Sequence, residues 1–204
     1  NAMLNIYKHD DYLPDARSGN SNGRTQGGAN SAVVIADAYV KGLTGIDFEE
    51  ALEAMLKDAT VPPGGTEEQE GRGGLKDYNK IGYVSQDFHR GGTRTVEYAY
   101  NDFNIATVAK GLGKLEIASR YYDQANNWQN LWRDISNNGS TGFIMPRNAD
   151  GSWVDTINCD LSDAPRESID YHPLARDWPR CVCWWCGFLY EASSWEYSLY
   201  VPHD

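Results

Sequence analysis

The sequence predicts a mainly α protein, and three observations support that class. Apolar residues recur at three- and four-residue steps in several segments. Alternating patterns typical of strands extend over only a few residues, and glycine-rich polar loops separate the helical segments. The length of 204 residues suits one ordinary domain.

The first two helices are predicted on either side of a glycine-containing turn. Residues 30–43 are apolar almost all round and reach Gly42, as the C-terminus of a helix would, so we expect an inner, buried helix. Asp47 precedes residues 48–57 as an N-cap, with two glutamates in the first turn and a lysine near the end. This pattern predicts a short amphipathic helix.

The next two segments predict a hairpin of antiparallel helices. Residues 93–112 form the first, and residues 115–132 continue the apolar spacing as a second helix that folds back on it. Glu97 and Asp102 either face the interior of a site or tie helices together through buried hydrogen bonds, and the buried tie is the favoured interpretation. The first helix is predicted to place Val96, Ala99, Tyr100, Phe103 and Ala106 on one face and Glu97, Asn101 and Asn104 on another.

Three long polar segments connect the predicted helices, at residues 14–29, 61–74 and 133–170. Compact domains keep loops of this length mainly where they have a function, so these loops are candidates for the rim of a site. The helix hairpins would suit a solenoid or a closed toroid. Since no repeat of fixed period is present, the sequence favours a segment of a toroid.

Composition excludes several partners. A formal net charge of -11 with only 18 basic residues disfavours nucleic acid and anionic membrane surfaces, because both require a clustered cationic face. No apolar run is long enough for a transmembrane helix, and the N-terminus lacks a signal pattern. Seven Trp and thirteen Tyr suggest that some aromatic rings line a cavity.

The four cysteines leave the redox compartment open. Cys181, Cys183 and Cys186 lie close together and Cys159 lies apart, which does not match the paired knuckles of a zinc ribbon. Buried thiols are the favoured interpretation, and a disulfide or a metal site stays open.

The last fifteen residues combine acids, aromatic residues and a histidine. Glu191 stands beside Tyr190 and four residues before Trp195. Aromatic surroundings raise the pKa of a carboxyl group and suit it to donate a proton, and aromatic faces stack on sugar rings. The segment therefore indicates carbohydrate chemistry.

Several blocks of the chain, taken in order, resemble glycoside hydrolase family 92, the calcium-dependent exo-acting α-mannosidases. The blocks are Leu13-Pro14-Asp15-Ala16-Arg17, Thr25-Gln26-Gly27-Gly28, Ala36-Asp37-Ala38-Tyr39-Val40-Lys41-Gly42, Thr95-Val96-Glu97-Tyr98-Ala99-Tyr100-Asn101-Asp102, Met145-Pro146-Arg147-Asn148-Ala149-Asp150-Gly151, and Glu191-x-x-x-Trp195-Glu196-Tyr197 with Val201-Pro202-His203-Asp204. The resemblance runs from about residue 4 to the last residue and is weakest between residues 155 and 186.

The resemblance implies a β-sandwich followed by an (α/α)6 barrel, of which residues 1–204 would form part of the barrel only. The expected activity is release of terminal α-linked mannose, of the α-1,2 type, from mannose-rich glycans with inversion. A Ca²⁺ ion would grip two sugar hydroxyls. The expected partners are mannose-containing glycans and the remainder of the same polypeptide, and the expected location is secreted or extracytoplasmic.

The resemblance also implies roles for individual residues. Glu191 matches the general acid, although Ala192 replaces the glycine that usually follows it. Asp15 and Arg72 match family positions that hold hydroxyls of the terminal mannose. Carboxylates and guanidinium groups suit this role, since they bind neighbouring hydroxyls in bidentate fashion. Trp195 is either a sugar platform or part of the core. The general base and most calcium ligands would lie beyond Asp204, so the metal ligands are unassigned.

Two other hypotheses remain beside the enzyme. A non-catalytic helical module with aromatic platforms would hold mannosides without cleaving them. A structural scaffold of helix hairpins would bind a protein partner and no saccharide, which the long polar loops and clustered acids disfavour.

Overall fold

The computed structural model describes residues 1–14, 17–18, 21–22, 29–62, 71–88, 91–137 and 140–154, and this part of the chain is mainly helical, as predicted. It contains six α-helices, one 3₁₀ helix and two short antiparallel β-hairpins. In chain order the elements are α1 (Ala2–Asp10), β1 (Arg17–Ser18), β2 (Ser21–Asn22), α2 (Ser31–Val40), α3 (Phe48–Thr60), α4 (Leu75–Ile81), α5 (Gly91–Gly111), α6 (Leu115–Gln124), η1 (Asn127–Leu131), β3 (Trp132–Asn137) and β4 (Ser140–Ile144).

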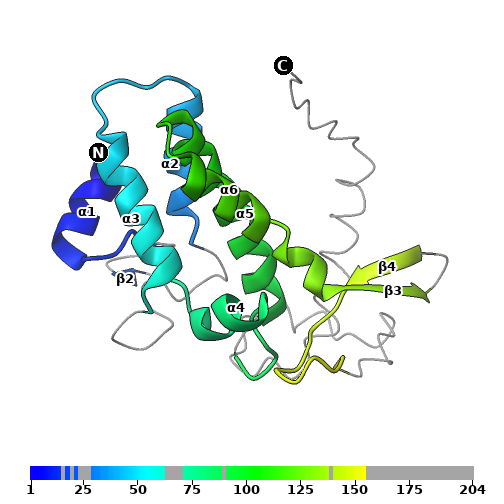
Figure 1. Cartoon of the computed structure of the whole chain (residues 1–204). Helices are drawn as coiled ribbons and strands as arrows, with labels where there is room; N and C mark the ends of the chain where they lie inside the picture. Colours follow the sequence, from blue (N-terminus) through cyan, green and yellow to red (C-terminus); the bar gives the residue numbers. More distant parts are fainter. Residues whose placement is uncertain are drawn as a thin grey trace, which may run out of the picture.

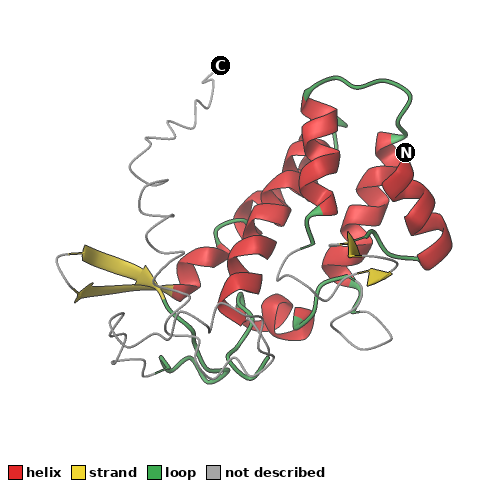
Figure 2. Ribbon diagram, turned by 180° about the vertical axis from the view of Figure 1, so that it is seen from behind, coloured by secondary structure: helices red, strands yellow, loops and turns green. Residues whose placement is uncertain are grey.

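Helix α5 is the central element. It packs against α6, α2, α3 and η1, while α1 packs on the outside of α3. Figure 1 shows α4 at the lower end of these helices and the loop from α2 to α3 at the opposite end. The β3–β4 hairpin projects sideways near the lower end (Figure 1). The view from behind shows the same division between a helical body and a projecting hairpin (Figure 2).

The two predicted N-terminal helices are present, with one correction. Asp47 caps α3, since its carboxylate accepts from the Glu50 N–H at 3.1 Å. Helix α2 is not buried all round, because Val34 is 50% exposed and Val40 is 70% exposed. Only the side of α2 that packs against α3 and α5 is covered by the described residues.

The predicted faces of α5 are partly wrong. Tyr100 and Phe103 are 52% and 36% exposed and stack on each other with ring planes 8° apart, whereas Asn101 and Asn104 are buried. Helix α5 has neighbours on several sides, so its buried surface is wider than one apolar stripe and includes polar positions.

The predicted second helix of the hairpin ends early. Helix α6 stops at Gln124, η1 follows, and Trp132 opens strand β3, where it pairs with Ile144. The four-residue step from Trp128 to Trp132 suits a helix, yet the chain uses it to bring the two indole rings edge to face, with centroids 6.2 Å apart. The β3–β4 hairpin therefore lies in a segment predicted as loop.

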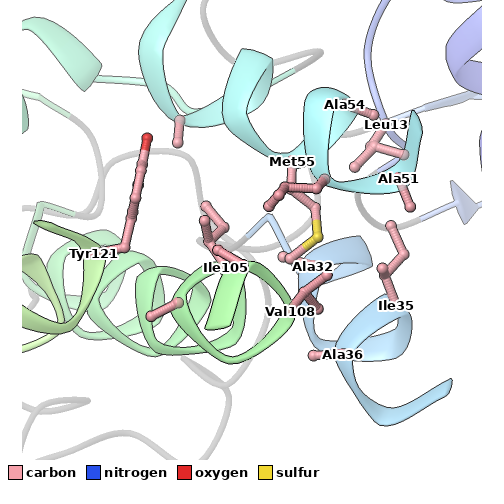
Figure 3. Packing of buried hydrophobic residues seen from close by; sticks show 14 of the residues in the cluster. Leu13, Ala32, Ile35, Ala36, Ala51, Ala54, Met55, Ile105, Val108 and Tyr121 are labelled. Atoms are coloured by element: carbon pink, nitrogen blue, oxygen red, sulfur yellow. The ribbon is translucent and has the colours of Figure 1, made fainter. Parts of the chain in front are cut away.

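The main hydrophobic core lies between α2, α3, α5 and α6. Met55 of α3 is 1% exposed, and Figure 3 shows it reaching towards Ala32 of α2 and Val108 of α5. The buried members of this core are Leu4, Leu13, Ala32, Ile35, Ala36, Ala51, Leu52, Ala54, Met55, Ala59, Ile105, Ala106, Val108, Ala109, Ala118 and Tyr121. The many alanines allow the helices to approach closely.

We expect Met55→Ala to lower the free energy of unfolding by about 2–5 kcal/mol, because it removes apolar contacts and leaves a cavity between three helices. Urea unfolding followed by circular dichroism measures the change. Val40→Ala on the exposed side of α2 is the control and should have little effect. Equal losses in the two variants would contradict this placement of the core.

Candidate functional site

Of the predicted site residues, Arg72 lies in the described part of the chain. Asp15, Glu191 and Trp195 lie outside the described residues, as do all four cysteines and the segment from 155 to 204. The site can therefore be built upward from Arg72 and the side chains around it.

Arg72 forms a buried ion pair with Asp102, near the middle of α5. Its Nη1 donates to Asp102 Oδ1 at 2.6 Å, and the two side chains are 2% and 1% exposed. A buried carboxylate is costly unless a cation and further hydrogen bonds satisfy it. Asp102 therefore ties the segment before α4 to α5, which agrees with the buried tie predicted for it, while Glu97 is half-buried.

Two tyrosines complete the surroundings of this pair. The Tyr78 hydroxyl of α4 donates to Asp102 Oδ2 at 2.7 Å, so each carboxylate oxygen accepts a hydrogen bond. The guanidinium of Arg72 lies over the ring of Tyr98, with its carbon 5.2 Å from the ring centroid. Tyr98 in turn accepts from Arg94 Nη1 and donates to the Gly73 carbonyl, both at 2.9 Å. We name Arg72, Tyr78, Tyr98 and Asp102 the arginine cluster.

The charges in the arginine cluster shift the pKa of its members. Burial is the largest influence on the pKa of Arg72 and lowers it, but the charge of Asp102, the hydrogen bond to it and the two tyrosines together raise the pKa above its ordinary value. Burial, reinforced by the charge of Asp102, raises the pKa of the Tyr78 hydroxyl well above its ordinary range. Burial also raises the pKa of Asp102, and the charge of Arg72 and the hydrogen bonds from Tyr78 and Arg72 oppose that rise. Since a guanidinium keeps its proton in proteins and lies 2.6 Å from the carboxylate, we treat Arg72 and Asp102 as an ionic pair with Tyr78 as a neutral donor.

Two buried polar side chains have atoms without a hydrogen-bond partner within the part of the chain that the structure describes. These atoms are Nε of Arg72 and both amide atoms of Asn101, which is 0% exposed. An unsatisfied buried polar group costs about 1–3 kcal/mol and calls for an explanation, such as a ligand or an ordered water. The open donor of Arg72 is the feature of this cluster that points to a ligand.

Neighbouring contacts fasten the start of α5 to the chain that follows α4. Thr95 Oγ1 accepts from the Val84 N–H at 2.9 Å, and a Cβ at Gly91 would lie 2.4 Å from the backbone oxygen of Ser85. Only glycine permits this close approach, which joins the chain after α4 to the first turn of α5.

The two predicted rim loops at residues 14–29 and 61–74 begin side by side. Asp58 Oδ1 accepts from the Leu13 N–H at 3.3 Å, and the Ser31 hydroxyl donates to the Pro14 carbonyl. The Tyr12 hydroxyl donates to the Pro62 carbonyl at 3.2 Å. The chain thus enters both segments next to the end of α3.

The segment around Arg147 forms a turn that side-chain hydrogen bonds hold in place. Arg147 Nε donates to the Gly151 carbonyl and Nη1 to the Asn130 carbonyl, both at 2.9 Å, and its guanidinium lies 4.7 Å from the Trp153 centroid. Asp150 accepts from the backbone N–H of Ser152 at 2.8 Å. These bonds shape the turn and attach it to η1.

Sequence reasoning missed the two tyrosines of the arginine cluster. Tyr98 lies four residues before Asp102, so helical spacing places both on one face of α5, and this signal was present in the sequence. Tyr78 carries no comparable signal, because only packing brings α4 to Asp102.

The described residues contain no group of three His, Cys, Asp or Glu side chains that could hold a metal ion. None of the helices in this part of the chain is long and apolar enough to cross a membrane.

Comparison with known proteins relates this chain to one family of glycosidases. The model of the glycosyl hydrolase family 92 catalytic domain matches residues 1–204, and the chain belongs to this family. Its helical part agrees with a segment of the (α/α)6 barrel that structures of this family contain.

A curated relative and two solved structures show the extent of the likeness. An uncharacterized secreted glycosidase of Arthroderma benhamiae is 38% identical over 99% of this chain and 26% of its own length. A family GH92 inverting mannosidase of Bacteroides thetaiotaomicron is 33% identical with a TM-score of 0.70, over 78% of this chain and 21% of its own. A family GH92 alpha-mannosidase from the same species, in complex with mannoimidazole, is 28% identical with a TM-score of 0.64, over 76% and 19%. The matched part of the chain thus spans about a fifth to a quarter of the length of these proteins.

We expect Asp102→Asn to destabilise the protein by about 3–5 kcal/mol, because it leaves the Arg72 guanidinium buried without its counter-charge. Denaturant unfolding measures the loss. Asp37→Asn is the matched control, since it breaks an ion pair with Lys41 in which both side chains are more than half exposed. A loss no larger than that of the control would show that the Arg72–Asp102 pair is not buried.

The raised pKa of Tyr78 predicts a loss of stability in alkaline solution. Below the ordinary tyrosine pKa of 10.0, the hydroxyl is neutral in both the folded and the unfolded protein. As the pH rises above that value, the unfolded chain loses this proton and the folded protein keeps it, so the stability due to Tyr78 declines. Unfolding free energies across this range should decline less steeply in Tyr78→Phe than in wild type or in the exposed variant Tyr100→Phe.

Proposed function

We propose that this chain forms part of the catalytic domain of an inverting exo-α-mannosidase that releases mannose from mannose-rich glycans. The observation that carries the proposal is the family match over residues 1–204, together with solved relatives described as GH92 mannosidases above 25% identity. The proposed substrate linkage is α-1,2. The name of the fungal relative supports a secreted or extracytoplasmic location.

The proposed mechanism divides the work between two carboxyl groups. In an inverting glycosidase one carboxyl group protonates the leaving oxygen and another activates a water on the opposite face of the sugar, with roughly 6.5–9.5 Å between them. We assign the acid to Glu191, on the sequence resemblance. We assign the base to polypeptide beyond these 204 residues. The N-terminal β-sandwich and the rest of the barrel are likewise assigned to other parts of the polypeptide.

The remaining roles concern binding. Asp15 would accept from, and Arg72 would donate to, hydroxyls of the terminal mannose, so that a non-reacting part of the ring is fixed while the anomeric carbon distorts. Trp195 would either stack on the sugar or support the site. Calcium, when bound, would supply Lewis-acid chemistry to the sugar. We assign its ligands to parts of the protein outside the described residues.

The arginine cluster supports a neutral ligand. The positive charge of Arg72 is balanced by Asp102 at 2.6 Å, so the pair presents hydrogen-bond donors without a net charge. A site for a carboxylate or a phosphate would instead leave its cation uncompensated. Mannose is neutral and rich in hydroxyl acceptors.

We expect Glu191→Gln to reduce kcat for mannose release by about 10²–10⁴-fold while mannoside binding is retained, because only the proton donor is lost. The assay uses a polypeptide that contains this chain and the regions its relatives have, with an α-1,2-linked mannobiose and Ca²⁺ or a chelator. Glu196→Gln, in the same segment, is the control and should keep most of the activity.

The outcomes separate the hypotheses. Binding of the mannobiose that is unaffected by Glu191→Gln, with no turnover in the wild type, would indicate the non-catalytic binding module. Release of mannose that is insensitive to the chelator would remove the calcium part of the proposal. Absence of both binding and release would overturn the mannosidase proposal as a whole.

A further inference from the structure

We infer that Asp102 and Tyr78 are positioning residues for mannoside binding, which hold the Arg72 guanidinium so that its Nε donates to a sugar hydroxyl. The inference rests on the proposed function, because it takes the ligand to be a neutral mannoside. It assigns a role to two residues of α5 and α4 that would not touch the sugar themselves. The argument depends on how the guanidinium is held, on its open donor and on charge.

The guanidinium of Arg72 is held from two directions. Asp102 engages its Nη1 at 2.6 Å, and the ring of Tyr98 covers one face at 5.2 Å. Arginine has a planar fork, so an edge contact and a face contact together leave it little freedom to rotate. The direction of the Nε–H bond follows from these two contacts.

Each holding residue is itself held. The second oxygen of Asp102 accepts from Tyr78 at 2.7 Å, which prevents the carboxylate from turning away. The Tyr98 hydroxyl bonds to Arg94 and to the carbonyl of Gly73, the residue next to Arg72. Tyr78 and Tyr98 also meet edge to face, with ring centroids 5.5 Å apart. The cluster is therefore a preorganised support.

The open Nε of Arg72 indicates what the support is for. The atom is buried and has no hydrogen-bond partner among the described groups, although its neighbour Nη1 is paired. A ligand oxygen that accepts this bond would remove an unfavourable feature of the free protein. Because Asp102 already neutralises the guanidinium, a hydroxyl is a better match than an anion.

Loss of the support should weaken substrate binding more than it slows turnover. The Arg72 contact would be made to the bound sugar before and during the reaction, and a contact of this kind affects KM while kcat changes less. We expect Tyr78→Phe to raise KM for an α-mannoside about tenfold, with kcat within about threefold of wild type. Tyr83→Phe is the matched control, because it also removes one 2.7 Å hydrogen bond, to Asn148, outside the arginine cluster.

A chemical rescue tests the role of Asp102 directly. The experiment uses the complete polypeptide with Arg72→Ala, to which guanidinium chloride is added at low millimolar concentration, and binding of methyl α-mannoside is measured by calorimetry. If Asp102 positions the guanidinium, added guanidinium should restore binding in Arg72→Ala but not in the double variant Arg72→Ala, Asp102→Asn. Melting temperatures of each sample show whether it is folded.

The possible results separate this inference from the proposed function. Rescue of melting temperature without rescue of mannoside binding would overturn the inference and leave Arg72 a purely structural residue. Equal rescue in the double variant would also overturn it. A wild type that binds methyl α-mannoside and hydrolyses nothing would overturn the proposed activity alone, whereas a wild type that does not bind it would overturn both.

Discussion

The carboxylate of Asp102 lies inside the helical body, almost completely removed from solvent, and much of the surrounding structure depends on satisfying it. Its charge requires a cation, which Arg72 supplies, and its second oxygen requires a donor, which Tyr78 supplies. Both partners come from outside α5. The chain before α4 and α4 itself must therefore lie against the middle of α5.

This requirement determines the path of the chain around Arg72. Gly74 adopts a positive φ of 69° at the start of α4, and a Cβ there would lie 2.6 Å from a side-chain carbon of Val84. Glycine is thus needed for the turn that carries Arg72 inward and Tyr78 back towards Asp102. Ser85 then meets Gly91 at the first turn of α5, so the segments on both sides of α4 are fastened to the same helix.

The contacts of η1 and the β3–β4 hairpin extend this support to the end of the described chain. Arg147 connects its own turn to Asn130, and Tyr83 reaches the Asn148 carbonyl. The described ends of the segments predicted as rim loops are thus attached to α3, to the chain after α4 and to η1. A helical support of this kind suits a binding site whose residues are placed on loops and held from behind.

The sequence by itself determined the helical class, the Asp47 cap, the hairpin of α5 and α6 and the family, because periodicity, capping and ordered motifs are local properties of the chain. It also predicted Asp102 as a buried tie, while the sugar-binding role that the resemblance implies for Arg72 stays a prediction. Only the tertiary structure decided that these two residues are partners, that Tyr78 joins them, that Asn101 is buried while Tyr100 is exposed, and that Trp132 opens a strand. These features depend on which elements meet in space, and α5 has neighbours on so many sides that no single helical stripe could predict which of its residues are covered.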